Sequence, residues 1–451
     1  MSVTPRRVVI LGAAGRDFHN FNTVYRDRPE VRVVAFTATQ IPGIEDRRYP
    51  AALAGSLYPQ GIPIVAEQEL ADLIRRERPD EAVFSYSDVT YDHVGHLSAL
   101  CTSLGVDFVL LGADKTMLRS KVPVIGITAV RTGCGKSQTT RYVSRILKDL
   151  GKRVVAIRHP MPYGDLAAQA CQRFAAYEDL DRHRCTIEER EEYEPHIDNG
   201  FVVYSGVDYQ RILRSAEEEA DVILWDGGNN DLPFYACDLH ICIADPHRAG
   251  HELRYHPGEA NFRMADIIII NKCDSAPMAG IGTIEANAAR LNPKALVLQA
   301  DSPVTCAHPE QVAGKQALVI EDGPTLTHGS MTFGAGVVAA RQCGAAAIVD
   351  PAPFAVRSIA ATYQAYPNAK GILPAMGYSP EQIADLQATI EATPCDMVLS
   401  ATPIDLTRVL KVSRPMVRVR YELAERRPGV LARRVEELLE RRGRPALAGK
   451  A

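Results

Sequence analysis

The sequence lacks the features typical of secreted, membrane and nucleic-acid-binding proteins. Its ten cysteines are scattered without a C-x-x-C pair, which favours free thiols in a reducing compartment over a disulfide framework. No apolar run approaches the roughly 18 residues that a membrane helix needs. The formal net charge is only −4, which argues against broad affinity for nucleic acids or anionic membranes. We therefore expect a cytoplasmic protein that binds neither nucleic acid nor membrane.

The length and composition are those of a globular protein with more than one domain. At 451 residues, with 46% hydrophobic and 24% charged side chains, the chain should form two or three domains. Apolar strands alternate with amphipathic helices, which predicts an α/β fold. We expect a Rossmann-like N-terminal domain, a central P-loop NTPase domain with a mainly parallel sheet, and a C-terminal α/β domain, at residues 1–120, 121–310 and 311–451.

The first and third of these domains are predicted from hydrophobic patterns. In the first, strands are expected at 7–12, 31–36, 82–86 and 107–111, with helices near 67–77 and 91–104. In the third, strands are expected at 317–320, 345–349, 370–373, 396–400 and 416–421, with helices at 334–342, 379–391 and 428–441. The loops at these strand ends carry several polar residues that could contact a ligand.

The segment VPVIGITAVRTGCGKSQTT, residues 122–140, has the form of a strand, a phosphate-binding loop and a helix. Backbone N–H groups of such a loop surround phosphate oxygens, while Lys136 would reach the β and γ phosphates and the Ser137 hydroxyl would contact Mg²⁺. The usual pattern has glycine five residues before Gly135, where this chain has Val130. This form resembles the loops of the dethiobiotin-synthetase and metallochaperone branch of P-loop enzymes. The predicted nucleotide-binding residues of the loop are Thr132, Gly133, Cys134, Gly135, Lys136, Ser137 and Gln138.

A second strand end supplies a candidate metal ligand. The apolar run from Val222 to Trp225 stops at Asp226. An aspartate at the carboxyl end of a strand beside the P-loop strand can hold the water shell of Mg²⁺. We therefore predict Ser137 and Asp226 as metal-binding residues, and Lys136 and Asp226 as catalytic residues.

A third strand end carries a motif of the kind that reads a nucleotide base. Four isoleucines, 267–270, fit a strand buried on both faces of a parallel sheet. The Asn271-Lys272-Cys273-Asp274 that follows resembles the guanine-reading motif of GTPases, in which the aspartate accepts from the base and the lysine stem covers the ring. Some ATPases of this branch keep a similar asparagine, so ATP and GTP both stay open. Asn271, Lys272 and Asp274 are the predicted residues at the base.

Four segments together resemble one enzyme family along nearly the whole chain. They are GAAGRDFHNFN at 12–22, the P-loop, RHPMPYGDL at 158–166 and EDGPTLTHG at 321–329. In this order they look like the cyclic 2,3-diphosphoglycerate synthetase family. The resemblance implies ATP-driven, Mg²⁺-dependent closure of 2,3-diphosphoglycerate into its cyclic phosphoanhydride, with release of ADP and phosphate. It also implies a small phosphorylated substrate, and it is compatible with a monovalent cation and with a homo-oligomer.

Under this resemblance, several cationic and polar residues become candidates for neutralising the substrate. Arg158 and His159 follow the strand after the P-loop helix, which would place them beside the γ-phosphate as catalytic residues. The predicted substrate-binding residues are Arg16, His19, Asn20, Thr325, Thr327, His328 and Arg408. Because the chain as a whole is slightly acidic, we expect these residues to form one local cationic site facing the P-loop.

The acidic run EEREEYE at 188–194 is expected to be the solvated face of a helix. Under the family resemblance, Glu194 within it is also a candidate metal ligand. Two alternative functions remain open. One is a GTPase switch or metallochaperone that acts on a partner protein, which Asn271-Lys272-Cys273-Asp274 favours, although the sequence has no His-rich or Cys-rich tract for metal loading. The other is a 2-phosphoglycerate kinase, which the same site could perform.

Overall fold

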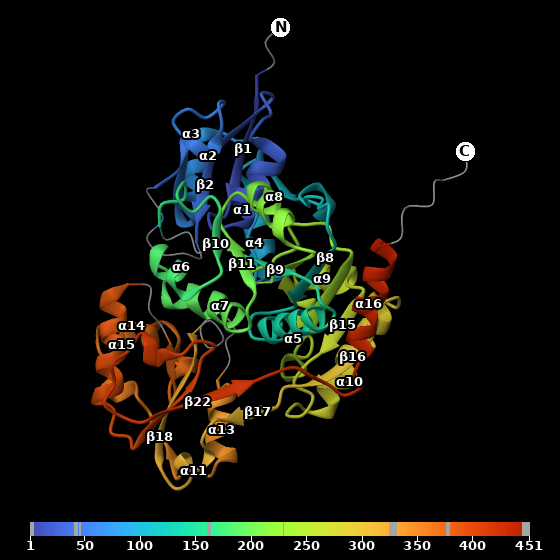
Figure 1. Ribbon diagram of the computed structural model, residues 1–451. Coiled ribbons are helices and arrows are strands. Elements are labelled where there is room, and N and C mark those ends of the chain that lie inside the picture. The colour runs from blue at the N-terminus through green and yellow to red at the C-terminus, as the bar shows by residue number, and fades with distance from the viewer. Residues whose placement is uncertain are drawn as a thin grey trace.

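The computed structural model describes residues 4–39, 44, 47–159, 164–228, 230–323, 332–375 and 379–443. This part of the chain forms three main β-sheets with helices packed against them. In Figure 1 the N-terminal sheet (blue) lies at one end, the central sheet (green to yellow) in the middle, and the third sheet (orange) at the other end. The predicted α/β class is therefore confirmed.

The first sheet has the strand order β3-β4-β2-β1-β5-β7 and is parallel except at β3. Apolar side chains pack on both of its faces in two separate clusters, as expected for a parallel sheet covered by helices. The strands and helices predicted here all form within a few residues of their expected ends. The elements are β1 (Arg6–Leu11), α1 (Arg16–Asn20), the π-helix η1 (Phe21–Tyr25), β2 (Val31–Ala38), β3 (Arg48–Tyr49), α2 (Ala51–Ala54), β4 (Ile62–Ala66), α3 (Leu70–Glu77), β5 (Glu81–Phe84), β6 (Val89–Thr90), α4 (Tyr91–Ser103) and β7 (Asp107–Leu110).

The central sheet has nine strands in the order β10-β11-β9-β12-β8-β13-β15-β16-β23. The seven inner strands are parallel, and the edge strands β10 and β23 are antiparallel to their neighbours. The P-loop strand β8 pairs with β12, which pairs with β9, so the carboxyl ends of these three strands lie side by side. The strands are β8 (Val124–Ala129), β9 (Val154–Arg158), β10 (Gln172–Phe174), β11 (Val202–Ser205), β12 (Val222–Asp226), β13 (Leu239–Ala244), β15 (Ile267–Ile270), β16 (Leu296–Asp301) and β23 (Ala424–Glu425).

Helices cover the central sheet, and all four isoleucines of β15 are buried. One small ribbon connects this sheet to the first unit, because β14 (Tyr255–His256) pairs with β6. The helices of the central unit are α5 (Lys136–Asp149), α6 (Tyr177–Arg182), α7 (Ile187–Asp198), α8 (Tyr209–Glu219), α9 (Gly258–Met264) and α10 (Met278–Leu291).

The third sheet has the order β17-β22-β21-β18-β19, and β20 also pairs with β18. Strand β18 is central and its apolar residues are buried. The predicted strands and helices of this region form. Its elements are β17 (Val304–Cys306), α11 (Pro309–Val312), β18 (Gln316–Asp322), α13 (Ala335–Gln342), β19 (Ala347–Ile348), α14 (Arg357–Ala365), β20 (Leu373–Ala375), α15 (Pro380–Ala392), β21 (Met397–Ala401) and β22 (Met416–Tyr421).

The last described segment of the chain returns to the central sheet. Strand β23 pairs with β16, and α16 (Val430–Gly443, red in Figure 1) packs on the P-loop helix α5 (teal). Leu431, Val435 and Leu438 of α16 belong to the same core as Val143 and Leu147 of α5. Burial of this apolar stripe holds α16 on the central unit. The last helix of the predicted third domain, 311–451, therefore packs on the central unit.

Two expectations from composition can be compared with the structure. All ten cysteines are free thiols, as predicted. In the described ranges, no helix combines the length and the apolarity needed to cross a membrane.

Candidate active site

The phosphate loop between β8 and α5 has two glycines with left-handed backbone angles. The φ angles of Gly133 and Gly135 are +81° and +110°, a region that favours glycine. A Cβ atom on Gly135 would lie 2.1 Å from Nδ2 of Asn271, so any other residue would displace that side chain. Lys136 begins α5 directly afterwards. The buried Thr132 hydroxyl has no hydrogen-bonding partner within the described chain, which leaves it for a ligand oxygen.

Three nitrogen-bearing side chains converge on Asp226 at the end of β12. Nζ of Lys136 lies 2.7 Å from Oδ1, Nη1 of Arg158 lies 2.6 Å from Oδ2, and Nε2 of His196 lies 3.3 Å from Oδ2. Glu192 pairs with the other terminal nitrogen of Arg158. Asp226 is 0% exposed and Arg158 is 1% exposed. The structure thus brings the predicted catalytic residues Lys136, Arg158 and Asp226 into one buried cluster.

The charges in this cluster follow from burial and from the opposite charges in contact. Burial would raise the pKa of Asp226, but Arg158 and Lys136 outweigh it and hold that pKa well below its usual range. Burial, assisted by Arg158, lowers the pKa of Lys136 to about 8, although Asp226 acts in the opposite direction. Burial also lowers the pKa of His196. Near neutral pH the carboxylate is therefore ionised and Lys136 is mostly charged.

The residues present fit a nucleoside triphosphate with Mg²⁺. The buried Nε of Arg158 has no hydrogen-bonding partner within the described ranges, so it is available to a phosphate oxygen. Ser137, in the first turn of α5, is exposed, and Asp226 is ionised. Across the described residues, no group of three or more His, Cys, Asp or Glu side chains is arranged to hold a metal ion. Mg²⁺ at such sites generally uses one or two protein ligands together with phosphates and water.

The predicted base-reading motif contacts the phosphate loop from the end of β15. Nδ2 of Asn271 donates to the carbonyl oxygen of Cys134 at 2.9 Å. Nζ of Lys272 donates to the carbonyl oxygen of Gly133 at 2.6 Å and to Asp245 at 2.9 Å. Asp245, at the end of β13, was not predicted. These bonds fix the loop, so at least part of the motif has a structural role.

Gln138 and Asp274, the remaining two predicted nucleotide-binding residues, both accept hydrogen bonds from Ser302. Its backbone N–H donates to Oδ1 of Asp274 at 3.0 Å, and its hydroxyl donates to Oε1 of Gln138 at 3.1 Å. Gln138 is buried and Asp274 is exposed. The loop residue Cys134 is also buried, and burial raises the pKa of its thiol to about 11, so the thiol stays protonated. Contact of these residues with a base stays a prediction.

The loop after β1 reaches the fourth predicted catalytic residue, His159. A Cβ atom on Gly15 would lie 1.9 Å from Nε2 of His159, so the loop packs directly on the imidazole. The same nitrogen lies 3.5 Å from Oδ2 of the buried Asp231. Burial raises the pKa of Asp231, although His159 and Arg16 oppose that shift. Sequence reasoning missed Asp231, and the available signal was its place in a Gly/Asn-rich loop five residues after Asp226.

Arg16 joins the first unit to the loop that carries Asp231. Its guanidinium group donates to the Thr116 hydroxyl at 3.1 Å and to the Leu232 carbonyl at 3.2 Å. It also lies 4.6 Å above the ring of Phe234. Burial lowers the pKa of Arg16 to about 10, and the group remains charged at neutral pH. Through these contacts Arg16 packs between the first unit and the central unit. Contact of Arg16 with a ligand stays a prediction.

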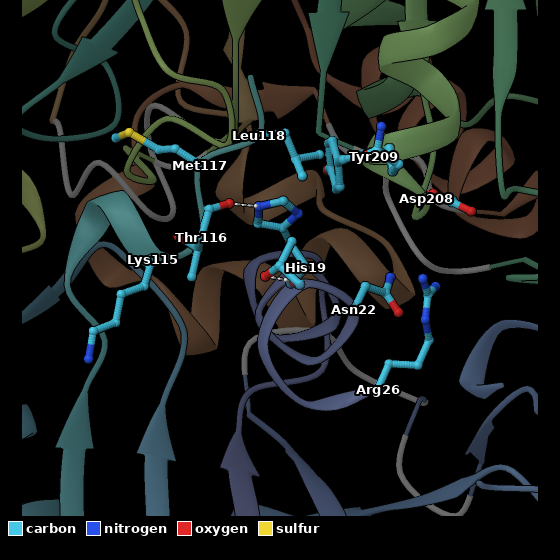
Figure 2. A pocket seen from close by; sticks show the side chains of 11 residues that line it. His19, Asn22, Arg26, Lys115, Thr116, Met117, Leu118, Asp208 and Tyr209 are labelled. Atoms are coloured by element: carbon cyan, nitrogen blue, oxygen red, sulfur yellow. Dashed lines mark hydrogen bonds between the residues drawn. The ribbon is translucent and has the colours of Figure 1, made fainter. Parts of the chain in front are cut away.

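His19 and Asn20 are also engaged within the protein. The His19 ring stacks on Phe234 with 4.2 Å between ring centroids, and its Nε2 lies 2.6 Å from the Thr116 carbonyl oxygen. Burial lowers the pKa of His19 to about 3, so the ring is neutral. His19 and Thr116 line a cavity of about 270 Å³, and Figure 2 shows the contact between the His19 ring and the Thr116 carbonyl oxygen. Nδ2 of Asn20 donates to the Ser85 hydroxyl at 2.9 Å.

The other predicted ligand residues have partners outside the Asp226 cluster. Oε1 of Glu194 accepts from Arg190 at 3.0 Å, so the proposed metal ligand is used in an ion pair on its own helix. The Arg408 guanidinium lies 3.9 Å above the ring of Tyr177 of α6. Three predicted substrate-binding residues lie outside the described residues, namely Thr325, Thr327 and His328.

The acidic helix α7 is buried, so the prediction of a solvated face was wrong. Glu188 is 2% exposed and Glu191 is 6% exposed. The first residue of the helix, Ile187, packs into the core of the third sheet, while Glu192 reaches the Asp226 cluster. Figure 1 shows α7 between the central and third sheets. A charge run in the sequence carries no information about the surface that will enclose it.

Comparison with known proteins gives two relatives and several matches among solved structures. No family model matches the chain. Arginine synthetase ArcE of Thermococcus kodakarensis is 59% identical over 420 residues, which are 93% of this chain and 94% of that protein. Cyclic 2,3-diphosphoglycerate synthetase of the same organism is 23% identical over 264 residues, 52% of this chain and 60% of that protein. The crystal structure of "apo" form LpxK from Aquifex aeolicus in complex with ATP covers 82% of this chain and 99% of its own, at 13% identity and a TM-score of 0.45, which is too low to carry an argument.

These findings contradict the predicted ring closure of 2,3-diphosphoglycerate. The relative that matches along almost the whole chain is named an arginine synthetase, whereas the diphosphoglycerate synthetase matches only about half of it. The phosphorylated three-carbon substrate therefore loses its support, and neither relative supports a GTPase switch or a phosphoglycerate kinase. Both relatives are named synthetases. The chain belongs to the family of arginine synthetase ArcE, with a distant likeness to cyclic 2,3-diphosphoglycerate synthetase.

Proposed function

We propose that this protein is an ATP-dependent synthetase that makes arginine. The similarity of this chain to arginine synthetase ArcE supports arginine as the product. The observation that carries the proposal is the convergence of Lys136 and Arg158 on Asp226 beside a phosphate loop. Such a set of donors suits the transfer of a γ-phosphoryl group, in which the protein mainly positions and neutralises charge.

The chemistry of arginine explains why phosphoryl transfer would be required. A guanidinium group is a ureido group in which nitrogen has replaced oxygen. A ureido oxygen is a poor leaving group, whereas the same oxygen departs readily as inorganic phosphate once it is phosphorylated. The acceptor in this proposal is therefore the ureido analogue of arginine. Ammonia is the nitrogen donor that gives arginine directly, because an amino-acid donor would leave its carbon skeleton on the new nitrogen.

The proposed reaction has two balanced steps. First, the bond between the γ-phosphorus of ATP and its bridging oxygen breaks, and a bond from that phosphorus to the ureido oxygen forms, which releases ADP. Next, the ammonia nitrogen bonds to the ureido carbon as the carbon–oxygen bond breaks, which releases phosphate. Arginine, ADP and phosphate are the products of one ureido compound, one ATP and one ammonia.

The chain's own residues have defined roles in this proposal. Lys136 and Arg158 neutralise the transferring phosphoryl group, and Asp226 orients both donors. His159, which contacts Gly15 and Asp231, would exchange a proton with the ureido group. When bound, Mg²⁺ would be held by Ser137 and Asp226 and would neutralise charge on the phosphates.

The proposal is tested with purified protein, ATP, Mg²⁺, the ureido analogue of arginine and ammonium chloride. Arginine and phosphate should appear in equal amounts, measured by amino-acid analysis and phosphate assay. Omitting either the ureido compound or ammonium should stop arginine formation. ATP hydrolysis without arginine in the complete mixture would contradict the proposal.

A further inference from the structure

A buried polar network lies where the first unit meets the phosphate loop. Oδ1 of Asp88, in the loop after β5, accepts from Nε of Arg131 at 2.8 Å and from Nδ2 of Asn230 at 3.0 Å. The carbonyl oxygen of Asn230 accepts in turn from Nδ2 of Asn261, on α9, at 2.9 Å. Asp88 and Asn230 have φ angles of +62° and +60°, a conformation that few residues with a side chain adopt and that recurs at ligand sites. One enclosed network thus joins the first unit, the phosphate loop and α9.

Two acceptor oxygens of this network have no partner. They are Oδ2 of Asp88, whose side chain is 5% exposed, and Oδ1 of Asn261, which is 0% exposed. The orientation of the Asn261 amide is fixed, because its Nδ2 donates to the carbonyl oxygens of both Asn230 and Asp231. Buried polar atoms in proteins nearly always have partners. A ligand that fits these two oxygens must therefore supply N–H or O–H donors.

The charge of the network is already balanced, which restricts the class of ligand. The Asp88 carboxylate is paired with the Arg131 guanidinium, which also lies 3.7 Å above the ring of Tyr255. The neighbouring carboxylate, Asp231, faces His159 and Arg16. A further cation would bring an uncompensated charge into a buried site, whereas a small neutral donor would not.

The network adjoins both parts of the proposed reaction. Arg131 belongs to the loop that runs from β8 to α5, where the phosphates of ATP would bind. Nδ2 of Asn261 donates to the carbonyl oxygen of Asp231 at 3.3 Å, and Oδ2 of Asp231 lies 3.5 Å from Nε2 of His159. A ligand of the network would therefore lie beside the groups proposed to act on the ureido compound.

We propose that ammonia, as the neutral base, binds between Asp88 and Asn261 and is held there as the nitrogen donor. The assignment rests on the proposed function. The N–H groups of ammonia match the two free oxygens, and its lack of charge matches the balanced ion pair beside them. Its lone pair stays available for the new bond to the ureido carbon.

The kinetic test compares Asn261→Ala with Asn292→Ala in the full chain. Nδ2 of Asn292 also donates to two backbone carbonyl oxygens, at 3.0 and 2.8 Å, so the two variants lose similar structural bonds. The KM for ammonium should rise about tenfold or more in Asn261→Ala and stay near that of wild type in Asn292→Ala. The KM values for ATP and for the ureido compound should stay near wild type in both. Equal KM values for ammonium in the two variants would overturn the assignment.

A second variant changes the other free oxygen. In Asp88→Asn, the remaining oxygen can still accept from Arg131 and Asn230, so the amide nitrogen takes the place of Oδ2 and offers a donor where ammonia needs an acceptor. The KM for ammonium should again rise about tenfold or more. An unchanged KM in a folded Asp88→Asn protein would contradict the site, and if this variant does not fold, Asn261→Ala decides.

Thermal melting separates this inference from the proposed function. Melting temperatures are compared in ammonium chloride and potassium chloride at equal ionic strength and mildly alkaline pH. The ammonium salt should stabilise wild type and Asn292→Ala, but not Asn261→Ala. If wild type makes arginine and Asn261→Ala keeps its KM for ammonium, the assignment is overturned and the function stands. If wild type makes no arginine, the function fails and melting alone decides: equal effects of the two salts, or an ammonium effect that persists in Asn261→Ala, overturn the ammonia site.

Discussion

Nζ of Lys136 lies 2.7 Å from Oδ1 of Asp226, so the phosphate-loop lysine is paired with the carboxylate that the sequence predicts as a metal ligand. Arg158 holds the other oxygen of the same carboxylate at 2.6 Å. Under the proposed function, Asp226 orients Lys136 towards the phosphate oxygens.

Replacing Lys136 with alanine should remove activity and leave the fold intact. Arginine formation should fall by about 100-fold or more, since a charge that acts on the transferring group is lost. The melting temperature should change little, because Arg158 continues to pair with Asp226. Steady-state rates and thermal melting of the same preparation check this. Near-wild-type turnover in Lys136→Ala would remove the phosphoryl-transfer role from this loop.

The pH dependence should report Lys136. Its pKa is lowered to about 8, so the free enzyme loses this charge as the pH rises through that value, and kcat/KM for ATP should fall by about tenfold per pH unit above it. Deprotonation of Lys136 does not destabilise the fold, so unfolding is not the cause of this fall in kcat/KM. Between about pH 8 and the ordinary lysine pKa of about 10.4, the unfolded chain binds more protons, so this group's contribution to stability rises with pH.

The control for the pH profile is Lys136→Arg, which keeps its charge throughout this range. If it retains measurable activity, its decline in kcat/KM should lie at higher pH than that of wild type. Calorimetric titration of ATP gives the same information without turnover. An identical decline in both proteins would assign the ionisation to another group.

Gly15→Ala should lower activity through His159. Its Cβ atom would meet Nε2 of His159 at 1.9 Å and push the imidazole away from Asp231. A displacement of about 1 Å at a reacting group can slow a reaction by about 100-fold. Gly112→Ala is the matched control, since no atom lies within 4 Å of a Cβ at that position. Both rates should be measured at saturating ATP, and equal rates would show that the first unit does not position His159.

Much of the fold was predictable from the sequence, but only part of the site was. The P-loop and the strand end at Asp226 placed Lys136, Asp226 and Arg158 correctly together, because parallel strands align their carboxyl ends. His196 and Asp231 were missed because their roles depend on how a helix and a loop pack, which no local pattern states. The prediction of 2,3-diphosphoglycerate as the acceptor of the phosphoryl group was wrong for a related reason. A phosphate loop specifies the donor, whereas the acceptor pocket is formed by other parts of the chain.

Glu191→Gln should make the protein more stable. The raised pKa of Glu191 means that its ionisation opposes folding at every pH above the ordinary glutamate value of about 4.3. The amide removes that penalty, so near neutral pH the melting temperature should rise by on the order of 2 °C relative to wild type. The difference should shrink towards pH 4–5, in the range where Glu191 becomes protonated in both states. Scanning fluorimetry across this range, with Glu189→Gln as control, would contradict the account if Glu191→Gln melted lower at neutral pH.

The central claim is that ATP phosphorylates an oxygen of the substrate before nitrogen replaces it. The most direct test uses the ureido analogue of arginine with ¹⁸O in its ureido group, together with ATP, Mg²⁺ and ammonium. The account predicts that the released inorganic phosphate carries one ¹⁸O atom, seen as an isotope shift in ³¹P NMR, in step with arginine formation. Arginine formed with unlabelled phosphate would contradict it.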